Sequence, residues 1–188
     1  MSFFPAYFNL KNRKILLIGG GYIALEKLEK LVDFTKEITV ISKEVSPDFQ
    51  NFASLHEIGI EKRSYVTGDI LTYDIVIVAT DTVTLHKAIY EESRSTRILV
   101  NSVDDTAYCD FIFPSYIKKG DLTISVSTSG TSPAMAKRLR VYLEKLIPSS
   151  IEPFLKEMKE LRKSLPKGKK RMKFFEEKSD EFMNRYFK

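Results

Sequence analysis

The stretch Ile15-Leu16-Leu17-Ile18-Gly19-Gly20-Gly21-Tyr22-Ile23-Ala24 decides the fold of this chain. Four apolar residues predict a buried strand, and the G-x-G-x-x-A spacing after them predicts a tight turn into a helix that starts near Tyr22. Glycines at such a turn let backbone N–H groups approach a pyrophosphate, and the positive end of the helix dipole favours phosphate. The order of strand, turn and helix therefore predicts a dinucleotide site, although glycine turns also follow strands in folds that bind no dinucleotide.

Strand and helix patterns alternate through the rest of the N-terminal part. The predicted strands are 14–18, 37–41, 60–64, 75–79 and 98–101, and the predicted helices are 23–34, 47–57 and 83–92. Such alternation is typical of a parallel sheet with helices on both faces. We therefore expect an α/β fold of the Rossmann type over residues 1–113.

The pattern changes after Phe113-Pro114. Two short strands (115–118 and 122–127), a polar loop and a helix (133–146) predict a small α+β segment over residues 114–147. Two amphipathic helices, near 152–164 and 169–187, then form a helical tail over 148–188. A hairpin and one helix are too small to bury a core of their own, so we expect the middle segment to form a homodimer.

Composition narrows the class of protein. The chain has 188 residues, of which 43% are hydrophobic and 29% charged, as in ordinary globular proteins. Residues 1–10 lack the features of a signal peptide and no apolar run is long enough to span a membrane, so we expect a cytoplasmic protein without membrane contact. One cysteine and two histidines predict neither a disulfide framework nor a metal cluster.

The net charge of +5 is concentrated in the tail, where residues 149–188 hold 12 Lys and Arg against 7 Asp and Glu. Basic tails usually form a solvated helical face. The tail contains no recognisable nucleic-acid module, so we do not expect nucleic acid as a partner.

The candidate cofactor residues lie at the ends of the predicted parallel strands, where open α/β sheets bind ligands. At the end of the second strand, Ser42 replaces the acid that usually binds the adenosine ribose of NAD. Lys43 would contact the 2′-phosphate of NADP or would simply be exposed, so the choice between the two cofactors stays open. The predicted cofactor contacts are Gly19, Gly21, Tyr22, Ile23, Ser42, Lys43, Thr80, Asp81, Asn101 and Val103.

Three carboxylates at this edge have more than one interpretation. Asp81 would contact the cofactor or cap the helix that starts at Val83. Asp104 and Asp105 follow the fifth strand, where they would act as a general base, hold a metal or cap a turn.

Six segments together resemble the precorrin-2 dehydrogenase and sirohydrochlorin ferrochelatase family, which also forms the N-terminal module of siroheme synthases. These segments are 4–10, 18–21, 79–81, 101–105, 109–115 and 127–133. Gly130-Thr131-Ser132-Pro133 and Asp110-Phe111-Ile112-Phe113-Pro114 are diagnostic, because generic dinucleotide-binding domains lack them. The resemblance covers residues 4 to about 147 and is loose in the tail. Fused members continue into a methyltransferase domain, an activity that we do not expect here.

The resemblance implies NAD-dependent oxidation of precorrin-2 to sirohydrochlorin. In some members it also implies insertion of ferrous iron, as a second substrate, to give siroheme. Asp104 matches the family aspartate implicated in both steps, and a carboxylate could accept the protons that each step releases. No role follows for Asp105, where some members carry a small residue. The substrate's carboxylates would bind the polar loop at Ser127, Thr128, Gly130 and Thr131, unless the loop only caps a helix through Ser132.

The basic tail gains a role from the same resemblance. An octa-anionic tetrapyrrole would be steered by Lys167, Lys169, Lys170 and Arg171, although a solvated face explains these residues equally well. Two other functions compete with the dehydrogenase. One is a non-catalytic NAD- or tetrapyrrole-binding carrier or sensor, which would not need Asp104. The other is an NADP reductase of small metabolites, which Lys43 favours and the Gly130–Pro133 loop does not.

Overall fold

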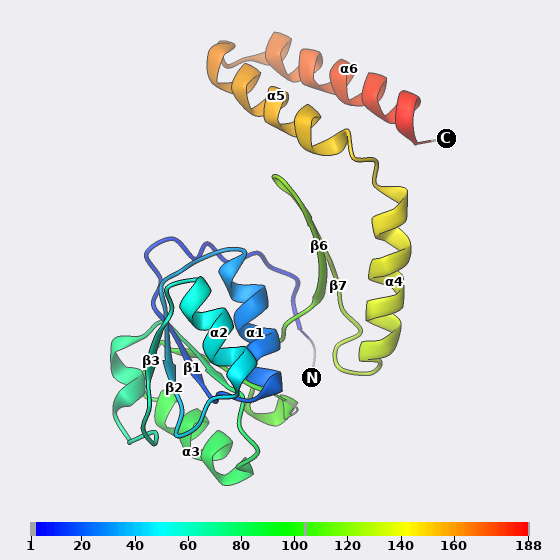
Figure 1. Cartoon of the computed structure of the whole chain (residues 1–188). Helices are drawn as coiled ribbons and strands as arrows, with labels where there is room; N and C mark the ends of the chain where they lie inside the picture. Colours follow the sequence, from blue (N-terminus) through cyan, green and yellow to red (C-terminus); the bar gives the residue numbers. More distant parts are fainter. Residues whose placement is uncertain (1–2, 104, 188) are drawn as a thin grey trace. The chain divides into compact units, whose positions relative to one another are not determined.

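The computed structural model describes residues 3–103 and 105–187, and the chain divides into two compact units, Met1–Ile112 and Phe113–Lys188 (Figure 1). The first unit is built on a five-stranded, fully parallel sheet of order β3-β2-β1-β4-β5. Its strands are β1 (Ile15–Ile18), β2 (Ile38–Ile41), β3 (Gly59–Glu61), β4 (Ile75–Val78) and β5 (Leu99–Ser102). Its helices are α1 (Tyr22–Val32), α2 (Pro47–Leu55), α3 (Val83–Ser93) and the 3-10 turns η1 (Asp69–Thr72) and η2 (Thr106–Tyr108). This topology confirms the predicted Rossmann-type α/β fold.

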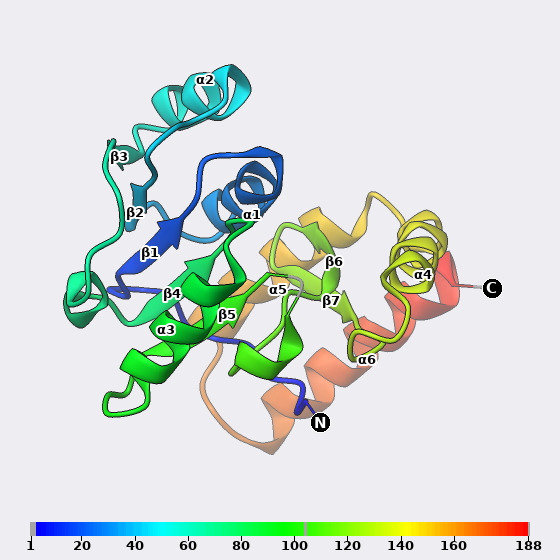
Figure 2. The same cartoon turned by 90° about the horizontal axis from the view of Figure 1, so that it is seen from below.

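Both faces of the sheet are buried, which explains why its central strands are continuous apolar runs. On one face, Leu16 and Ile18 pack in a cluster with Ile70 of η1 and Ile89 of α3. Side chains alternate along a strand, so the neighbouring residues of β1 point to the opposite face. There α1 and α2 pack against each other, while α3 covers the first face (Figures 1 and 2).

The strand order reverses at β1, with β2 on one side of it and β4 on the other. Hydrogen bonds continue the ladder past the strand ends and bring the loops together at one edge. The N–H of Gly19 donates to the Ile41 carbonyl at 3.0 Å, and that of Ala79 donates to the Ile18 carbonyl at 2.8 Å. A reversal of this kind opens a crevice beyond the carboxyl ends of the strands, where α/β proteins bind ligands.

Most predicted boundaries differ from the structure by one to three residues, and two of these differences have a local cause. The strand expected over 60–64 is β3, which ends at Glu61, because Arg63 turns the chain by donating from its N–H to the Glu61 carbonyl. The helix expected over 47–57 ends at Leu55, since Glu57 has a left-handed backbone with a φ of 60°.

The second unit contains an antiparallel hairpin of β6 (Ser115–Lys119) and β7 (Leu122–Val126), followed by helices α4 (Pro133–Leu146), α5 (Ile151–Ser164) and α6 (Lys169–Tyr186). Lys119 Nζ donates to the Ile147 carbonyl at 2.8 Å and so caps the C-terminal end of α4. Phe154 of α5 stacks on Phe182 of α6, with ring centroids 4.3 Å apart. Within the described residues, no helix has both the length and the apolar content needed to cross a membrane.

Candidate functional site

The three glycines of the turn after β1 serve different purposes. Gly19 has a φ of 126°, and a Cβ added to it would lie 2.1 Å from the carbonyl oxygen of Ala79. A Cβ on Gly20 would lie 2.4 Å from the carbonyl oxygen of Glu44. Both positions need glycine because neighbouring backbone leaves no room. A Cβ on Gly21 would meet no described atom within 4 Å, so this glycine leaves open space beside the turn.

Helix α1 starts directly at this turn, with Gly21 as its N-cap residue and no side chain capping it. Among the described residues, the N–H groups of Gly21, Tyr22 and Ile23 form no hydrogen bond. Free N–H groups at the positive end of a helix, beside the space that Gly21 leaves, fit a pyrophosphate. The turn therefore has the geometry that a dinucleotide cofactor requires.

A cleft of about 1040 Å³ opens at the turn, along the carboxyl edge of the sheet. Its walls come from the segments that follow β1, β2, β4 and β5, and its volume is at the upper end of the range usual for ligand sites. All the predicted cofactor residues except Asn101 line it: Gly19, Gly21, Tyr22, Ile23, Ser42, Lys43, Thr80, Asp81 and Val103.

Asn101 lies below the cleft and holds the chain that follows η2. Its side chain is buried, and Nδ2 donates to the Phe111 carbonyl at 2.9 Å. Cys109 is buried beside it, where the thiol donates to the Ser102 carbonyl at 3.1 Å and accepts from the Ser102 N–H at 3.2 Å. Burial raises the pKa of the Cys109 thiol, which keeps it protonated in this structural role.

The diagnostic segment that starts at Asp110 is anchored to β5. The guanidinium of Arg94 donates to both carboxylate oxygens of Asp110, at 2.9 and 2.7 Å. The same carboxylate accepts from the Val100 N–H at 2.9 Å. This pairing raises the pKa of Arg94 and makes Asp110 a structural residue.

Ser42 and Lys43 follow β2 and lie where the acid of NAD-binding domains usually stands. The Ser42 hydroxyl donates to the Glu44 carbonyl at 2.6 Å, which fixes the turn. Lys43 is exposed, lines the cleft, and forms no hydrogen bond or ion pair with the described residues.

Helix α3, which follows the loop after β4, contains a site residue that the sequence did not indicate, His86. It is 4% exposed, lines the cleft, and its Nε2 lies 2.8 Å from the Thr80 carbonyl oxygen. A carbonyl only accepts, so Nε2 carries the proton. Helix α3 is N-capped by Thr82 without a side-chain hydrogen bond. Asp81 is therefore not the cap of α3, and its exposed carboxylate faces the cleft.

The segment after β5 contributes Val103 and Asp105 to the cleft. The Val103 N–H donates to the Val78 carbonyl at 2.9 Å, which ties the segment to β4. Asp105 caps η2 by accepting from the Ala107 N–H at 3.0 Å. Asp104, the predicted catalytic residue, lies outside the described residues. Within the described parts of the chain, no three His, Cys, Asp or Glu side chains gather as a metal site.

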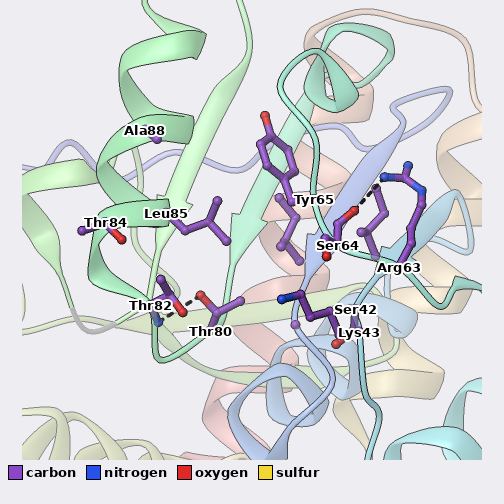
Figure 3. A pocket seen from close by; sticks show the side chains of 13 residues that line it. Ser42, Lys43, Arg63, Ser64, Tyr65, Thr80, Thr82, Thr84, Leu85 and Ala88 are labelled. Carbon is purple, nitrogen blue, oxygen red and sulfur yellow. Dashed lines mark hydrogen bonds between the residues drawn. The ribbon is translucent and has the colours of Figure 1, made fainter.

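A second cavity of about 550 Å³ continues from the cleft toward β3 and α3 (Figure 3). It shares Gly19, Ser42, Lys43, Thr80 and Thr82 with the cleft and adds residues that follow β3. The added residues on the β3 side are Arg63, Ser64 and Tyr65. In this fold the adenosine half of a dinucleotide lies beside the end of β2, so the second cavity fits that half.

The predicted substrate residues form a turn in the second unit, before α4. Thr128 Oγ1 accepts from the Ser132 N–H at 3.0 Å, and Ser127 Oγ accepts from the Ser129 N–H at 3.0 Å. Gly130 has a φ of 85°, and the Thr131 N–H donates to the Thr128 carbonyl. Ser132 supplies the cap of α4 through Met135 N, at 3.3 Å. The hydroxyls of Ser127 and Thr128 thus order the loop and are not part of the helix cap.

Two family descriptions match the chain. The first, "Putative NAD(P)-binding", matches residues 6–115, which is more than half of the chain. The second, "Sirohaem biosynthesis protein central", matches residues 119–146. The first match covers the whole parallel sheet and the cleft, and the second covers most of the hairpin and α4.

Siroheme synthases are among the curated relatives of this chain. Siroheme synthase 1 of Serratia proteamaculans (strain 568) is 34% identical over 151 residues, which cover 80% of this chain and 32% of the relative. Siroheme synthase of Neisseria meningitidis serogroup C (strain 053442) is 33% identical over the same length and shares of each chain. The chain thus spans about a third of the length of these relatives.

A solved structure, "SirC, precorrin-2 dehydrogenase", has the same fold, with a TM-score of 0.77 over 90% of this chain and 85% of that one, at 23% identity. That structure shows the likeness of fold, and the first family match, over more than half of the chain, shows the family. The chain therefore belongs to the putative NAD(P)-binding family, and a sirohaem biosynthesis central segment follows the matched region, as in the N-terminal module of siroheme synthases.

Proposed function

We propose that the chain oxidises precorrin-2 to sirohydrochlorin with NAD as the hydride acceptor. The observation that carries the proposal is the glycine turn, where Gly21 leaves open space beside the free N–H groups of α1. Relatives named siroheme synthase and the fold of a precorrin-2 dehydrogenase support the choice of substrate.

Bound NAD would supply the acceptor for a hydride. The N–H groups of Gly21, Tyr22 and Ile23 would bind its pyrophosphate, and the segments after β4 and β5 would lie beside the reacting end. Oxidation of the substrate removes one hydride and one proton, so a base is needed for the proton. We assign that role to Asp104, because its neighbours Val103 and Asp105 both line the cleft.

The loop that precedes α4 is the proposed binding site for the substrate's carboxylates. Its hydroxyls at Ser127 and Thr128 accept from the loop's own N–H groups and can still donate their hydrogen atoms. Gly130 would contribute its backbone N–H and Thr131 its side-chain hydroxyl at the positive end of α4.

The proposal includes a homodimer formed through α4. Four large apolar side chains lie three and four residues apart on this helix, and each is at least 42% exposed: Met135, Leu139, Tyr142 and Leu146. A stripe of this kind on one helix face fits the same stripe of a second copy related by a two-fold axis. The proposed location is the cytoplasm, where NAD is available and a lone reduced cysteine is usual.

Anaerobic incubation with precorrin-2 and NAD tests the proposal. The oxidation is followed by the absorbance of the tetrapyrrole and by that of NADH. We expect about one NADH for each sirohydrochlorin formed. Addition of ferrous iron afterwards tests the insertion step, which stays a prediction of the resemblance. Binding of NAD without any oxidation would instead support the carrier or sensor.

A further inference from the structure

We infer that the adenosine end of the cofactor site accepts a 2′-phosphate, so that the chain binds NADP⁺ at least as tightly as NAD⁺. The inference rests on the proposed function for the position of the nucleotide, and the observations that carry it come from the second cavity. Figure 3 shows residues of α3 along one wall of this cavity and the side chains that follow β2 and β3 along the other.

The lining of the second cavity carries positive charge and hydroxyl groups. Lys43 and Arg63 line it, and none of its described lining residues is an Asp or a Glu. Hydroxyls come from Ser42, Ser64, Tyr65, Thr80, Thr82 and Thr84. A carboxylate at the end of β2 normally pairs with the ribose hydroxyls of NAD and repels the additional phosphate of NADP. Glu44 lines only the larger cleft, so among the described residues no carboxylate lines this cavity at the end of β2.

The two cations have different freedom to bind a phosphate. Arg63 is already occupied: its Nε donates to Glu61 at 2.8 Å, and its Nη1 and Nη2 donate to Asp69 at 2.6 and 3.0 Å. Its Nη1 also donates to the Ser64 carbonyl. Arg63 therefore shapes the wall and has few donors left.

Lys43 is the cation that remains available. It lies directly after Ser42, lines both cavities, and pairs with no carboxylate among the residues described. A lysine ammonium beside the ribose position supplies three donors to a phosphate and pairs with its charge. Ser42 cannot replace the missing acid. Its hydroxyl hydrogen is donated to the Glu44 carbonyl, so only one neutral oxygen remains to accept from the ribose hydroxyls.

Calorimetric titration of the full chain with NAD⁺, NADP⁺, 5′-AMP and 2′,5′-ADP tests the inference, and none of these measurements needs catalysis. We expect NADP⁺ to bind at least as tightly as NAD⁺, and 2′,5′-ADP to bind about tenfold more tightly than 5′-AMP, as one charge-assisted contact contributes. Lys43→Ser should remove this advantage and weaken NADP⁺ binding about tenfold more than NAD⁺ binding. Ser42→Asp should weaken NADP⁺ binding more than NAD⁺ binding.

Lys62→Ser is the matched control, because Lys62 is exposed, stands beside Arg63 in the chain and lines neither cavity. It makes the same change of charge and should leave both affinities unchanged. If NAD⁺ binds and NADP⁺ binds more than about tenfold more weakly, the inference is wrong while the proposed function stands. An unchanged NADP⁺ affinity in Lys43→Ser would equally overturn it. If neither nucleotide binds, both the inference and the proposed function fail.

Discussion

His86 Nε2 donates to the carbonyl oxygen of Thr80 across 2.8 Å, so that a buried side chain of α3 holds the loop that leaves β4. Thr80 lines both the cleft and the second cavity, at the point where they join. A hydrogen bond from the interior therefore sets the shape of a wall that the nucleotide would contact.

Replacing His86 by Ala should loosen this wall. The Thr80 carbonyl would lose its donor, which costs about 1–3 kcal/mol in the free energy of unfolding. The affinity for NAD⁺ should fall several-fold, by roughly 1 kcal/mol. Thermal unfolding and calorimetric titration measure the two effects.

Two further variants separate the loss of the hydrogen bond from the loss of side-chain volume. His86→Gln keeps an N–H donor and should recover part of the NAD⁺ affinity. Lys87→Ala removes an exposed neighbour on α3 and should change neither quantity. An unchanged affinity in His86→Ala would show that the Thr80 loop is held by other contacts.

Two glycine variants should fail in opposite ways. Gly19→Ala places a Cβ 2.1 Å from the Ala79 carbonyl at a left-handed φ, so the folded state should lose at least about 2 kcal/mol. Gly21→Val meets open space and an extended backbone, and should cost about 1 kcal/mol or less. Its side chain would, however, block the N–H groups of α1, so NAD⁺ binding should fall by more than about tenfold.

Chemical denaturation and nucleotide titration of the same two proteins distinguish these outcomes. The Gly19 variant should unfold at lower denaturant concentration. If Gly21→Val binds NAD⁺ with the wild-type affinity, the pyrophosphate does not bind at this turn.

The sequence predicts the elements whose local signals agree. β1 and β4 are apolar runs beside turn residues, and they are central strands in the structure because both faces of the sheet are covered. The glycine turn also predicted the place of the cleft, because the spacing of its glycines reflects the local backbone geometry of a nucleotide-binding turn. β3 was predicted too far along the chain because the Arg63 N–H turns back to the Glu61 carbonyl, a contact that no pattern of hydrophobicity records.

The remaining site features depend on tertiary contacts. His86 looks like any polar residue of an amphipathic helix, and only the approach of Thr80 makes it part of the site. The sequence places Asn101 at the carboxyl edge of the sheet, where a cofactor contact is expected. In the structure its side-chain amide instead donates to the Phe111 carbonyl. Asp81 resembles a helix cap, and Thr82 occupies the cap position instead.

Asp104→Ala should abolish most oxidation of precorrin-2, by about 10²-fold or more as for the loss of a general base, while NAD⁺ still binds. The reason is that the proposed base acts on the substrate and not on the pyrophosphate. Single-turnover absorbance and nucleotide titration give the two measurements.

Asp105→Ala is the matched control for this variant. It removes a neighbouring carboxylate that caps η2 through the Ala107 N–H, so it should lower stability by about 1 kcal/mol and leave turnover largely intact. Full turnover in Asp104→Ala would contradict the assignment of the base, and equal losses in both variants would show that the segment matters as a whole.

The apolar stripe on α4 predicts a dimer in solution. Leu139→Glu introduces a charge at the centre of the stripe, where Leu139 is 42% exposed, and should convert the dimer to the 21.7 kDa chain. Sedimentation at micromolar concentration measures the mass. Lys137→Glu, which lies off the stripe on the same helix, should leave the dimer intact. A wild-type protein that sediments only as a 21.7 kDa species would refute the dimer.

The basic residues at the junction of α5 and α6 do not act alike. Arg171 Nη1 donates to the carbonyls of Arg162 and Leu165, both at 3.2 Å, and so caps the C-terminal end of α5. Lys167, Lys169 and Lys170 are exposed and form no hydrogen bond or ion pair with the described residues. Arg171 keeps its positive charge but also holds α5, so the three lysines are the residues whose charge can be removed without loosening the helical tail.

Lys167, Lys169 and Lys170 can be changed together to Gln, which removes their attraction for the anionic substrate. We expect KM for precorrin-2 to rise and the salt dependence of kcat/KM to become flatter, because salt screens that attraction. The NAD⁺ affinity should stay unchanged. Arg171→Gln is the comparison, since it should lower the stability of the helical tail with a smaller effect on the salt dependence. Steady-state kinetics at low and physiological salt measure both. If the triple variant keeps the wild-type salt slope, the lysines form a solvated face and the substrate reaches the cleft without their charge.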